Sequence, residues 1–388
     1  PRVKGVVMWG EPALEKAASM EGLIRANMGK PLRPAERSAE DVAVLMYTSG
    51  TTGRSKGAML SHRNIIFDAH ASDQVLHVCD DDAMIAILPL FHAYGFTVNM
   101  VLSVLKGLPV VLLPKFSAAE AMETMEREKV TILAAVPVMY QLMLRTKRTP
   151  DYDLSSLRVG VSGGAPAPID VMKQFEERYG VHMIEGYGPT EAAPVVSVNP
   201  PDGVRKWGSV GPPLPGIEVR VVDDDDNPLP AGEVGELCVR GPNVMLGYWK
   251  APELTAQTIK DGWLHTGDLA KLDEDNYIYI VDRKKDLIIV GGMNVYPREV
   301  EDIIYELDEI AEAAVVGVPD PVKGEEVIAF VAFKEGRSLE PEQIIEHCRQ
   351  RLARFKVPRE VFVEPELPKA PTGKVLRRKV REMARERL

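Results

Sequence analysis

Residues 47–57 read Tyr47-Thr48-Ser49-Gly50-Thr51-Thr52-Gly53-Arg54-Ser55-Lys56-Gly57 and directly follow a strand-like apolar run at residues 42–46. Glycines allow a backbone to turn so that its N–H groups point inward. Hydroxyl side chains and a lysine add donors and positive charge, so the stretch suits phosphate oxygens. It is not a Walker loop, because no Gly-Lys-Ser/Thr closes it. A plain polar turn is the alternative, but the preceding strand and the basic residues favour a phosphate loop.

The composition is that of an ordinary soluble globular protein, with 45% hydrophobic and 27% charged residues. Its 388 residues predict roughly two or three domains. A net charge of −10 argues against a general nucleic-acid binder. The three cysteines lie far apart and show no metal-binding spacing, so a reducing cytoplasm is expected. The sequence has no signal peptide and no apolar run of about 18 residues; a peripheral membrane contact and a homodimer stay open.

Residues 42–190 alternate between strand-like and helical segments, which predicts an α/β fold with a mostly parallel, helix-flanked sheet. The strand-like runs are Val42–Met46, Met84–Leu88, Val110–Leu113, Val130–Ala135, Leu157–Val161 and His182–Glu185. Ser117 and Glu120 have the spacing of a capping box at the start of a helix through Lys129. Ligands of open α/β sheets bind beyond the carboxyl ends of the strands. The phosphate loop and the other unusual loops are all expected at that edge.

The pattern changes after residue 206. Short alternating runs separated by Pro, Gly and Asp turns predict a small β subdomain at residues 207–284. The acidic run at residues 223–226 is interpreted as a solvated hairpin tip rather than a calcium site, because no ligand-loop spacing follows. Residues 285–388 are expected to form a smaller α+β domain, with helices at 297–307 and 341–355 and a strand at 327–333.

A second motif, Glu185-Gly186-Tyr187-Gly188-Pro189-Thr190-Glu191, follows the last strand-like run. Tyr187 can stack on a purine, Thr190 can donate to a phosphate, and Glu191 is a hard oxygen ligand suited to Mg²⁺ shared with phosphates. A surface turn with an incidental glutamate is the alternative. Together the two stretches resemble the phosphate loop and the adenine and magnesium motif of the adenylate-forming superfamily. That family comprises acyl- and aryl-CoA synthetases, luciferases and peptide-synthetase adenylation domains.

Further matches to this family follow in the same order along the chain. Asp268, in Thr-Gly-Asp-Leu, resembles the carboxylate that accepts both ribose hydroxyls. Arg283 resembles the arginine on the ribose and phosphate side of the nucleotide, and Lys285 aligns with the hinge position. Gly291 and Gly292 resemble the loop that enters the site for thioester formation with CoA. A surface turn is the alternative for Lys285, and an ordinary strand-to-helix connection is the alternative for the glycines.

Lys374, in Pro-Thr-Gly-Lys, resembles the lysine on the mobile C-terminal domain that neutralises charge during adenylation. The catalytic set implied by the resemblance is Lys374, Thr190, Glu191 and His92. The metal ligands implied are Glu191 and Thr51. The ATP- or AMP-binding set implied is Thr48, Ser49, Gly50, Thr51, Thr52, Gly53, Lys56, Gly163, Gly164, Ala165, Pro166, Glu185, Gly186, Tyr187, Gly188, Asp268, Ile280 and Arg283.

The loop Phe91-His92-Ala93-Tyr94-Gly95 distinguishes among subfamilies. Amino-acid-activating members of the resembled family place an aspartate here to pair with the substrate ammonium. This chain has His92 between apolar residues, which favours a carboxylic acid without an α-amine. His92 is expected to shape the acyl pocket rather than to act as a base. The other expected pocket residues are Tyr94, Val136, Pro137 and Gly163.

The resemblance therefore implies an ATP-dependent acyl-CoA ligase that uses ATP, Mg²⁺ and CoA to activate a medium- or long-chain fatty acid through an acyl-AMP. It also implies a large domain at residues 1–284 that is incomplete at its N-terminus, and a mobile domain at 285–388. An aryl-CoA ligase, an enzyme loading a carrier-protein thiol and a non-catalytic binding protein stay open. A hydrolase is a further alternative, since Gly160-Val161-Ser162-Gly163-Gly164 matches a nucleophile elbow and His265 follows.

Overall fold

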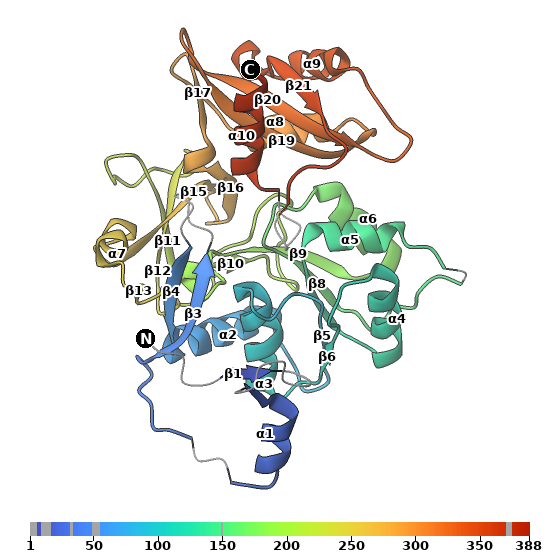
Figure 1. Ribbon diagram of the computed structural model, residues 1–388, viewed down its shortest axis with the longest axis vertical. Coiled ribbons are helices and arrows are strands. Elements are labelled where there is room, and N and C mark those ends of the chain that lie inside the picture. Colours follow the sequence, from blue (N-terminus) through green and yellow to red (C-terminus); the bar gives the residue numbers. More distant parts are fainter. Residues whose placement is uncertain (1–5, 9–16, 32–33, 49–54, 149, 370–374) are drawn as a thin grey trace. The chain divides into compact units, whose positions relative to one another are not determined.

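The structure is a computed structural model that describes residues 6–8, 17–31, 34–48, 55–148, 150–369 and 375–388 (Figure 1). It consists of two compact units, residues 1–41 and 42–388. In the first unit, β1 (Val6–Met8) pairs in parallel with β2 (Ala17–Ser19), and α1 (Met20–Asn27) follows. Ser19 caps α1 by accepting a hydrogen bond from the Gly22 amide at 3.2 Å. All further features belong to the second unit.

The strand before the phosphate loop lies outside the parallel sheet, contrary to the expectation from sequence. β3 (Val42–Thr48) pairs antiparallel with β4 (Lys56–Ser61), and β4 also pairs with β13 (Gly247–Tyr248). β3 and β4 thus pair as the two arms of a β-hairpin, with Thr48 opposite Lys56. The phosphate-loop residues 49–54 lie outside the described residues. A local apolar pattern predicts a strand, but it does not select the pairing partner.

The predicted parallel sheet is present, with helices on both faces. Its strands are β5 (Met84–Ala86), β6 (Val110–Leu112), β7 (Ile132–Ala135), β8 (Val159–Ser162), β9 (His182–Tyr187) and β10 (Ser197–Val198). They lie in the order β10-β9-β8-β7-β5-β6, and only β10 is antiparallel to its neighbour.

Alternate residues of these strands enter two different hydrophobic cores. One core packs Ile85 and Leu133 against α4 (Ala118–Glu128), α5 (Pro137–Arg145) and α6 (Ile169–Tyr179). The other packs Met84 and Ile132 against α2 (His62–Leu76) and α3 (Leu102–Lys106). The π-helix η1 (Gly95–Val101) leads into α3. The capping box expected at Ser117 is wrong, because its side chain makes no capping hydrogen bond, although α4 itself is confirmed.

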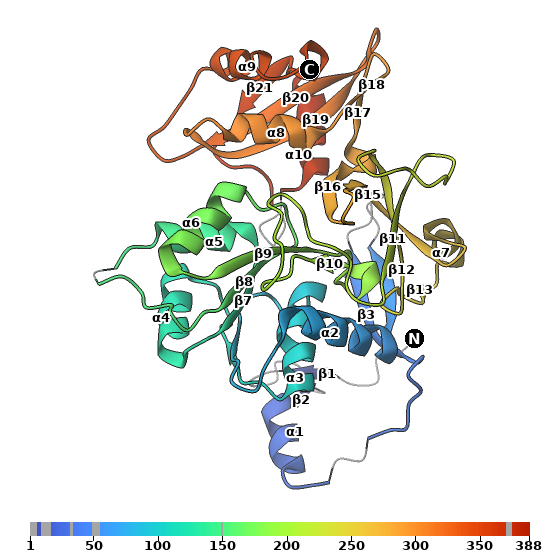
Figure 2. The same ribbon diagram turned by 180° about the vertical axis from the view of Figure 1, so that it is seen from behind.

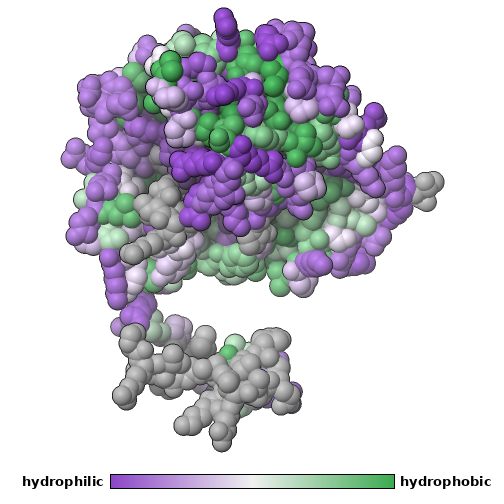
Figure 3. Space-filling model, turned by 45° about the horizontal axis from the view of Figure 1, so that its top comes forward, coloured by the Kyte–Doolittle hydropathy of each residue, from purple (hydrophilic) through white to green (hydrophobic). Residues whose placement is uncertain are grey.

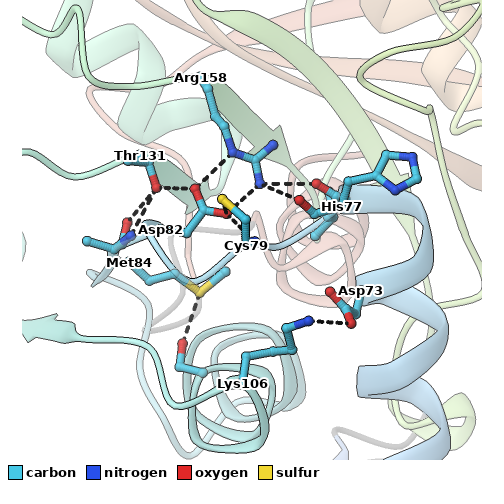
Figure 4. A network of polar contacts seen from close by, with 11 residues as sticks. Asp73, His77, Cys79, Asp82, Met84, Lys106, Thr131 and Arg158 are labelled. Carbon is cyan, nitrogen blue, oxygen red and sulfur yellow. Dashed lines mark hydrogen bonds and ion pairs between the residues drawn. The ribbon is translucent and has the colours of Figure 1, made fainter.

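Ionic contacts fasten the amino ends of the parallel strands, opposite the edge expected to bind ligands (Figure 4). Arg158, before β8, donates to both carboxylate oxygens of Asp82, before β5, at 2.9 and 2.7 Å. The Thr131 hydroxyl, before β7, donates to Asp82 at 2.6 Å. Burial alone would raise the pKa of Asp82, but the hydrogen bonds from Arg158 and Thr131 lower it to about 2. These contacts hold three strands in register away from the binding edge.

A five-stranded antiparallel sheet follows, as expected for the β subdomain. It contains β11 (Glu218–Val222), β12 (Gly235–Arg240), β14 (Ile259–Lys260), β15 (Trp263–Leu272) and β16 (Ile278–Arg283), with α7 (Pro252–Thr258) between β13 and β14. The acidic residues 223–226 form the turn after β11, where the Asp223 carboxylate accepts from the Asp225 and Asn227 amides. Among the described residues, no group of His, Cys, Asp and Glu could hold a metal ion on its own.

The last part of the chain builds a second five-stranded sheet with its own cores. Its strands are β17 (Ile288–Val290), β18 (Met293–Val295), β19 (Ile310–Asp320), β20 (Gly324–Phe333) and β21 (Glu360–Val363). Helices α8 (Pro297–Tyr305) and α9 (Pro341–Arg349) cover one face, and α10 (Arg377–Arg387) covers the other (Figure 2). The second predicted helix ends at Arg349, six residues before the expected end.

The domain boundary predicted between residues 284 and 285 falls inside the short helix η3 (Lys284–Asp286) and remains a prediction. Seen from the side of the C-terminal sheet, the surface is predominantly hydrophilic, with smaller hydrophobic areas between the charged side chains (Figure 3). No helix within the described ranges combines the length and the apolar character needed to cross a membrane.

Candidate functional site

A cavity opens beyond the carboxyl ends of β8 and β9, where an open α/β sheet binds its ligands. Its empty volume, part of it open to solvent, is about 600 Å³. Eight of the residues predicted from sequence line it: His92, Tyr94, Gly163, Gly164, Gly186, Tyr187, Gly188 and Thr190. The structure thus brings together loops that follow three different strands.

Two glycines of this wall are closely approached by neighbouring groups. A Cβ atom on Gly188 would lie 1.6 Å from the Pro194 carbonyl oxygen. A Cβ atom on Gly163 would lie 3.2 Å from two ring atoms of Tyr94. Glycine at these positions therefore lets Pro194 and Tyr94 pack directly against the backbone.

Tyr94 and His92 form the wall on the side of β5. The buried Tyr94 hydroxyl donates to the Val161 carbonyl at 3.0 Å, and burial raises the pKa of this phenol. His92 is exposed at the cavity, and its Nδ1 accepts from the Tyr94 amide at 3.3 Å. Both side chains therefore line the cavity, and the role expected for His92 in shaping it remains a prediction.

Three predicted nucleotide-binding residues lie in contact with one another. One is on β9 of the parallel sheet, and the other two are on β15 and β16 of the antiparallel sheet. The Tyr187 hydroxyl donates to Asp268 Oδ2 at 2.6 Å, and Arg283 Nε lies 3.2 Å from Asp268 Oδ1. β15 and β16 pair with Asp268 opposite Arg283, which fixes this ion pair. Burial, and then the Asp268 charge, raise the pKa of Tyr187, so the phenol remains a donor. A carboxylate has further lone pairs, and Asp268 can still accept hydroxyl groups of a ligand.

Glu191 and Lys56 are linked through a residue that the sequence did not single out. The Tyr248 hydroxyl donates to Glu191 Oε1 at 2.7 Å, and Lys56 Nζ lies 5.2 Å from the centre of the Tyr248 ring. Among the described residues, Glu191 Oε2 has no hydrogen-bond partner and neither oxygen is paired with a cation. This partly exposed carboxylate fits a single protein ligand to Mg²⁺, an ion that takes its other oxygens from phosphates and water.

Several predicted residues lie away from the cavity. The Glu185 side chain turns to the other side of β9, where it accepts from the Ala167 amide at 3.1 Å and lies beside Trp207. Burial raises the pKa of Glu185 to about 7. Ala165 and Pro166 continue the loop after Gly164 without lining the cavity.

Three more predicted residues do not line the cavity. Val136 packs near Tyr94, and Pro137 is buried in the first turn of α5. The Ile280 carbonyl accepts from Arg298 in α8 at 2.9 Å. These residues therefore support the site or its connection to the C-terminal sheet.

The predicted hinge and CoA-loop residues belong to the C-terminal part of the chain. Lys285 is exposed within η3. Gly291 and Gly292 have φ values of +59° and +80° and form the turn between β17 and β18. The Gly291 amide donates to the Lys323 carbonyl at 2.7 Å, so in this conformation the turn lies beside the β19–β20 turn. The predicted residues Ser49, Gly50, Thr51, Thr52, Gly53 and Lys374 lie outside the described residues.

The hydrolase alternative is wrong. Ser162 is the last residue of β8 rather than the tip of an exposed elbow, and it is completely buried. Its hydroxyl has no hydrogen-bond partner among the described residues. His265 instead lies against Cys238 and Glu236 of the β subdomain, at 3.5 and 3.4 Å. A nucleophile needs access to substrate and a base within hydrogen-bond reach, and Ser162 has neither in the described structure.

Sequence reasoning missed the apolar half of the cavity wall. Its residues come from α2, η1, β8 and the segment after Thr190: Ser72, Leu76, Val98, Val161, Pro194, Val195 and Val198. Only Ser72 among them is polar, and its buried hydroxyl has no partner within the described ranges. No motif marks these positions, because they face the cavity only after distant segments pack together.

Two family models match the chain. The model described as AMP-binding enzyme matches residues 3–249, and the model described as AMP-binding enzyme C-terminal domain matches residues 299–374. The matched segments include both glycine-rich motifs and end at Lys374.

Among curated proteins, the chain is similar to a long-chain-fatty-acid–CoA ligase of Bacillus subtilis, with 43% identity over 88% of this chain and 62% of the relative. A long-chain-fatty-acid–CoA ligase of Salmonella typhimurium is also 43% identical, over 89% of this chain and 62% of the relative. A feruloyl-CoA synthase of an Amycolatopsis species is 41% identical over 88% of this chain and 70% of the relative. The chain thus spans 62% of the length of these fatty-acid ligases.

Solved structures share the fold. The anthranilate CoA ligase AuaEII in complex with anthranoyl-AMP superimposes with a TM-score of 0.91, at 34% identity over all of this chain and 75% of that chain. ATP-bound MatB from Rhodopseudomonas palustris has a TM-score of 0.89, at 37% identity over 94% of this chain and 73% of that chain. Both similarities extend across the parallel sheet, the β subdomain and the C-terminal sheet.

Proposed function

This chain belongs to the AMP-binding enzyme family, and we propose that it acts as an ATP-dependent acyl-CoA ligase on a long-chain fatty acid. The observation that carries the proposal is the apolar cavity between the nucleotide motifs and α2. Its wall begins at Tyr187 and Thr190 and continues over Val98 and Leu76. A carboxylate bound near Thr190 would leave its hydrocarbon chain against apolar side chains, where each methylene contributes about 0.8 kcal/mol.

In this proposal, the glycine-rich loop around Lys56 binds the β- and γ-phosphates of ATP. Thr190 donates to the α-phosphate, and Asp268 accepts from the ribose hydroxyls. Tyr187 and the bare backbone at Gly163 contact the adenine. Mg²⁺ bound by Glu191 would neutralise phosphate charge. These parts position the reactants and stabilise charge, which are the main tasks in a reaction at phosphorus.

The proposed reaction has two steps at one site. A carboxylate oxygen of the fatty acid attacks the α-phosphorus, pyrophosphate leaves, and an acyl-AMP forms. The thiolate of CoA then attacks the acyl carbonyl carbon and AMP leaves with the carboxylate oxygen. Lys374 serves the first step by neutralising charge. The C-terminal sheet then turns near Lys285, so that Gly291 and Gly292 border the path of the CoA arm.

A screen of acids tests this function. Pyrophosphate release is measured with acetate, octanoate, palmitate and cinnamate, each with and without CoA. We expect the highest kcat/KM with palmitate and acyl-CoA formation only when CoA is present. Activity with acetate and with none of the other acids would contradict the proposal. Product that accumulates only on a carrier-protein thiol, with no dependence on CoA, would favour a carrier-loading enzyme instead.

An aryl-CoA ligase is the second candidate. The hydroxyl of Ser72 in the cavity wall is buried and has no partner among the described residues, so it could hydrogen-bond a ring substituent. The similarity to feruloyl-CoA synthase supports the same reading. Preference for cinnamate-type acids over palmitate in the screen would establish this candidate in place of the first.

A further inference from the structure

Tyr248 lies where the phosphate-loop hairpin meets the turn that carries Glu191. Tyr248 is 5% exposed. In the pairing of β13 with β4, it lies opposite Ala58, two residues after Lys56. Its hydroxyl reaches Glu191 Oε1 at 2.7 Å. Neither the phosphate loop nor the Glu191 motif contains this residue, which stands in a different part of the sequence.

The segment Asn243–Trp249 joins both phosphate-binding elements through its backbone. On one side, the Met245 amide donates to the Glu191 carbonyl at 2.8 Å, and the Asn243 side chain donates to the Ala192 carbonyl at 3.0 Å. On the other side, the Leu246 amide donates to the Met59 carbonyl at 2.9 Å, and the Trp249 amide donates to the Gly57 carbonyl at 2.7 Å. We call this segment the 243–249 bridge.

The side chain of Tyr248 also contacts a charged group of each phosphate-binding element. Its ring lies beneath the Lys56 ammonium at 5.2 Å, and its hydroxyl binds the Glu191 carboxylate. A neutral donor orients a carboxylate without cancelling its charge, whereas a lysine or arginine at this place would compete with a metal ion.

We propose that Tyr248 is a positioning residue that orients Glu191 toward the Mg²⁺ of bound Mg·ATP and ties this ligand to the Lys56 hairpin. The inference rests on the proposed function, because it takes ATP and Mg²⁺ as the ligands. With Oε1 held by the phenol, Oε2 is the oxygen left for the metal. The 243–249 bridge then keeps Glu191 and β4, which begins at Lys56, at a fixed separation.

The test is the substitution Tyr248→Phe, which keeps the ring beneath Lys56 and removes only the hydroxyl. ATP binding is measured by calorimetry without acid or CoA, across a series of Mg²⁺ concentrations and in EDTA. We expect the Mg²⁺ concentration for half-maximal tightening of ATP binding to rise about 10-fold or more, as for loss of a hydrogen bond to a charged group. Affinity for ATP in EDTA should stay that of the wild type.

Tyr277→Phe is the matched control. Tyr277 is 8% exposed, its hydroxyl donates to the Val204 carbonyl at 2.6 Å, and Lys206 Nζ lies 4.4 Å from its ring centre. It resembles Tyr248 in burial and contacts but does not touch Glu191, so its Mg²⁺ dependence should match the wild type. Thermal unfolding of both variants shows whether each is folded.

The possible outcomes separate the two proposals. A wild-type Mg²⁺ dependence in folded Tyr248→Phe would overturn the positioning role. Equal loss of affinity with Mg²⁺ and in EDTA would also overturn it, because a purely structural contact predicts that result. A wild-type chain that binds no ATP at any Mg²⁺ concentration would instead contradict the proposed function, and with it the basis of this inference.

Discussion

Replacing Val98 by phenylalanine should shorten the acid that the cavity accepts. Val98 is 4% exposed, lines the cavity and packs with Leu88, Tyr94 and Ala134. It lies on η1, which carries no residue proposed to bind the nucleotide. A larger side chain there therefore occupies space proposed for the acyl chain while leaving the ATP contacts in place.

The size of the effect follows from volume. Phenylalanine has about four more side-chain carbons than valine, enough to displace roughly four methylenes of a bound chain. At about 0.8 kcal/mol per methylene, palmitate loses about 3 kcal/mol, or roughly 200-fold in kcat/KM. For an acid about four carbons shorter than palmitate, kcat/KM of the variant should equal that of the wild type. The variant's optimum therefore moves to shorter acids. Overpacking also lowers the free energy of unfolding by about 1–3 kcal/mol.

The assay is pyrophosphate release over a series of saturated acids from octanoate to stearate, with thermal unfolding measured in parallel. Val104→Phe is the matched control, because Val104 lies on α3 and is 77% exposed. The control should leave the chain-length profile unchanged. If Val98→Phe lowers kcat/KM equally for every acid, the cavity at Val98 does not hold the acyl chain and the reasoning is refuted.

Three further predictions concern single side chains. Asp268→Asn should raise the Kd for ATP about 100-fold, because hydrogen bonds to a charged group contribute about 1.5–3 kcal/mol; an unchanged Kd by calorimetry would argue against ribose binding. Asp82→Asn should cost about 2 kcal/mol of unfolding free energy at pH 7, since the folded pKa of Asp82 is about 2 against a usual 3.8. This contribution is present above about pH 4 and is lost as the pH falls toward 2, so urea unfolding of wild type and variant should converge there; a gap that persists at pH 2 would contradict it. Lys374→Ala should abolish adenylation but spare thioester formation from supplied acyl-AMP, and equal loss of both steps would exclude the proposed role.

The predictions from sequence were correct where the functional residues and the strand that positions them lie in one short stretch. The loops at Gly163, Gly186 and Thr190 follow buried apolar strands, and parallel strands bring their carboxyl ends to one edge. The sequence therefore predicted that these loops would meet. It also predicted the α/β class and the approximate bounds of the five parallel strands β5 to β9.

The predictions were wrong where contacts between residues distant in the sequence determine the structure. Residues 42–46 form a strand as expected, but its partner is β4 rather than a strand of the parallel sheet. Glu185 belongs to a recognisable motif, yet alternation along β9 sends its side chain away from the cavity. Tyr248 contacts Glu191 across 57 residues of sequence, and no local pattern marks such a contact.

The central claim is most directly tested by identifying the products formed from ATP, Mg²⁺ and palmitate with and without CoA. The account predicts palmitate-dependent release of pyrophosphate, with palmitoyl-AMP retained on the protein when CoA is absent. With CoA present, it predicts palmitoyl-CoA and AMP in equal amounts. Formation of ADP and phosphate, or no pyrophosphate above the level seen without palmitate, would contradict it.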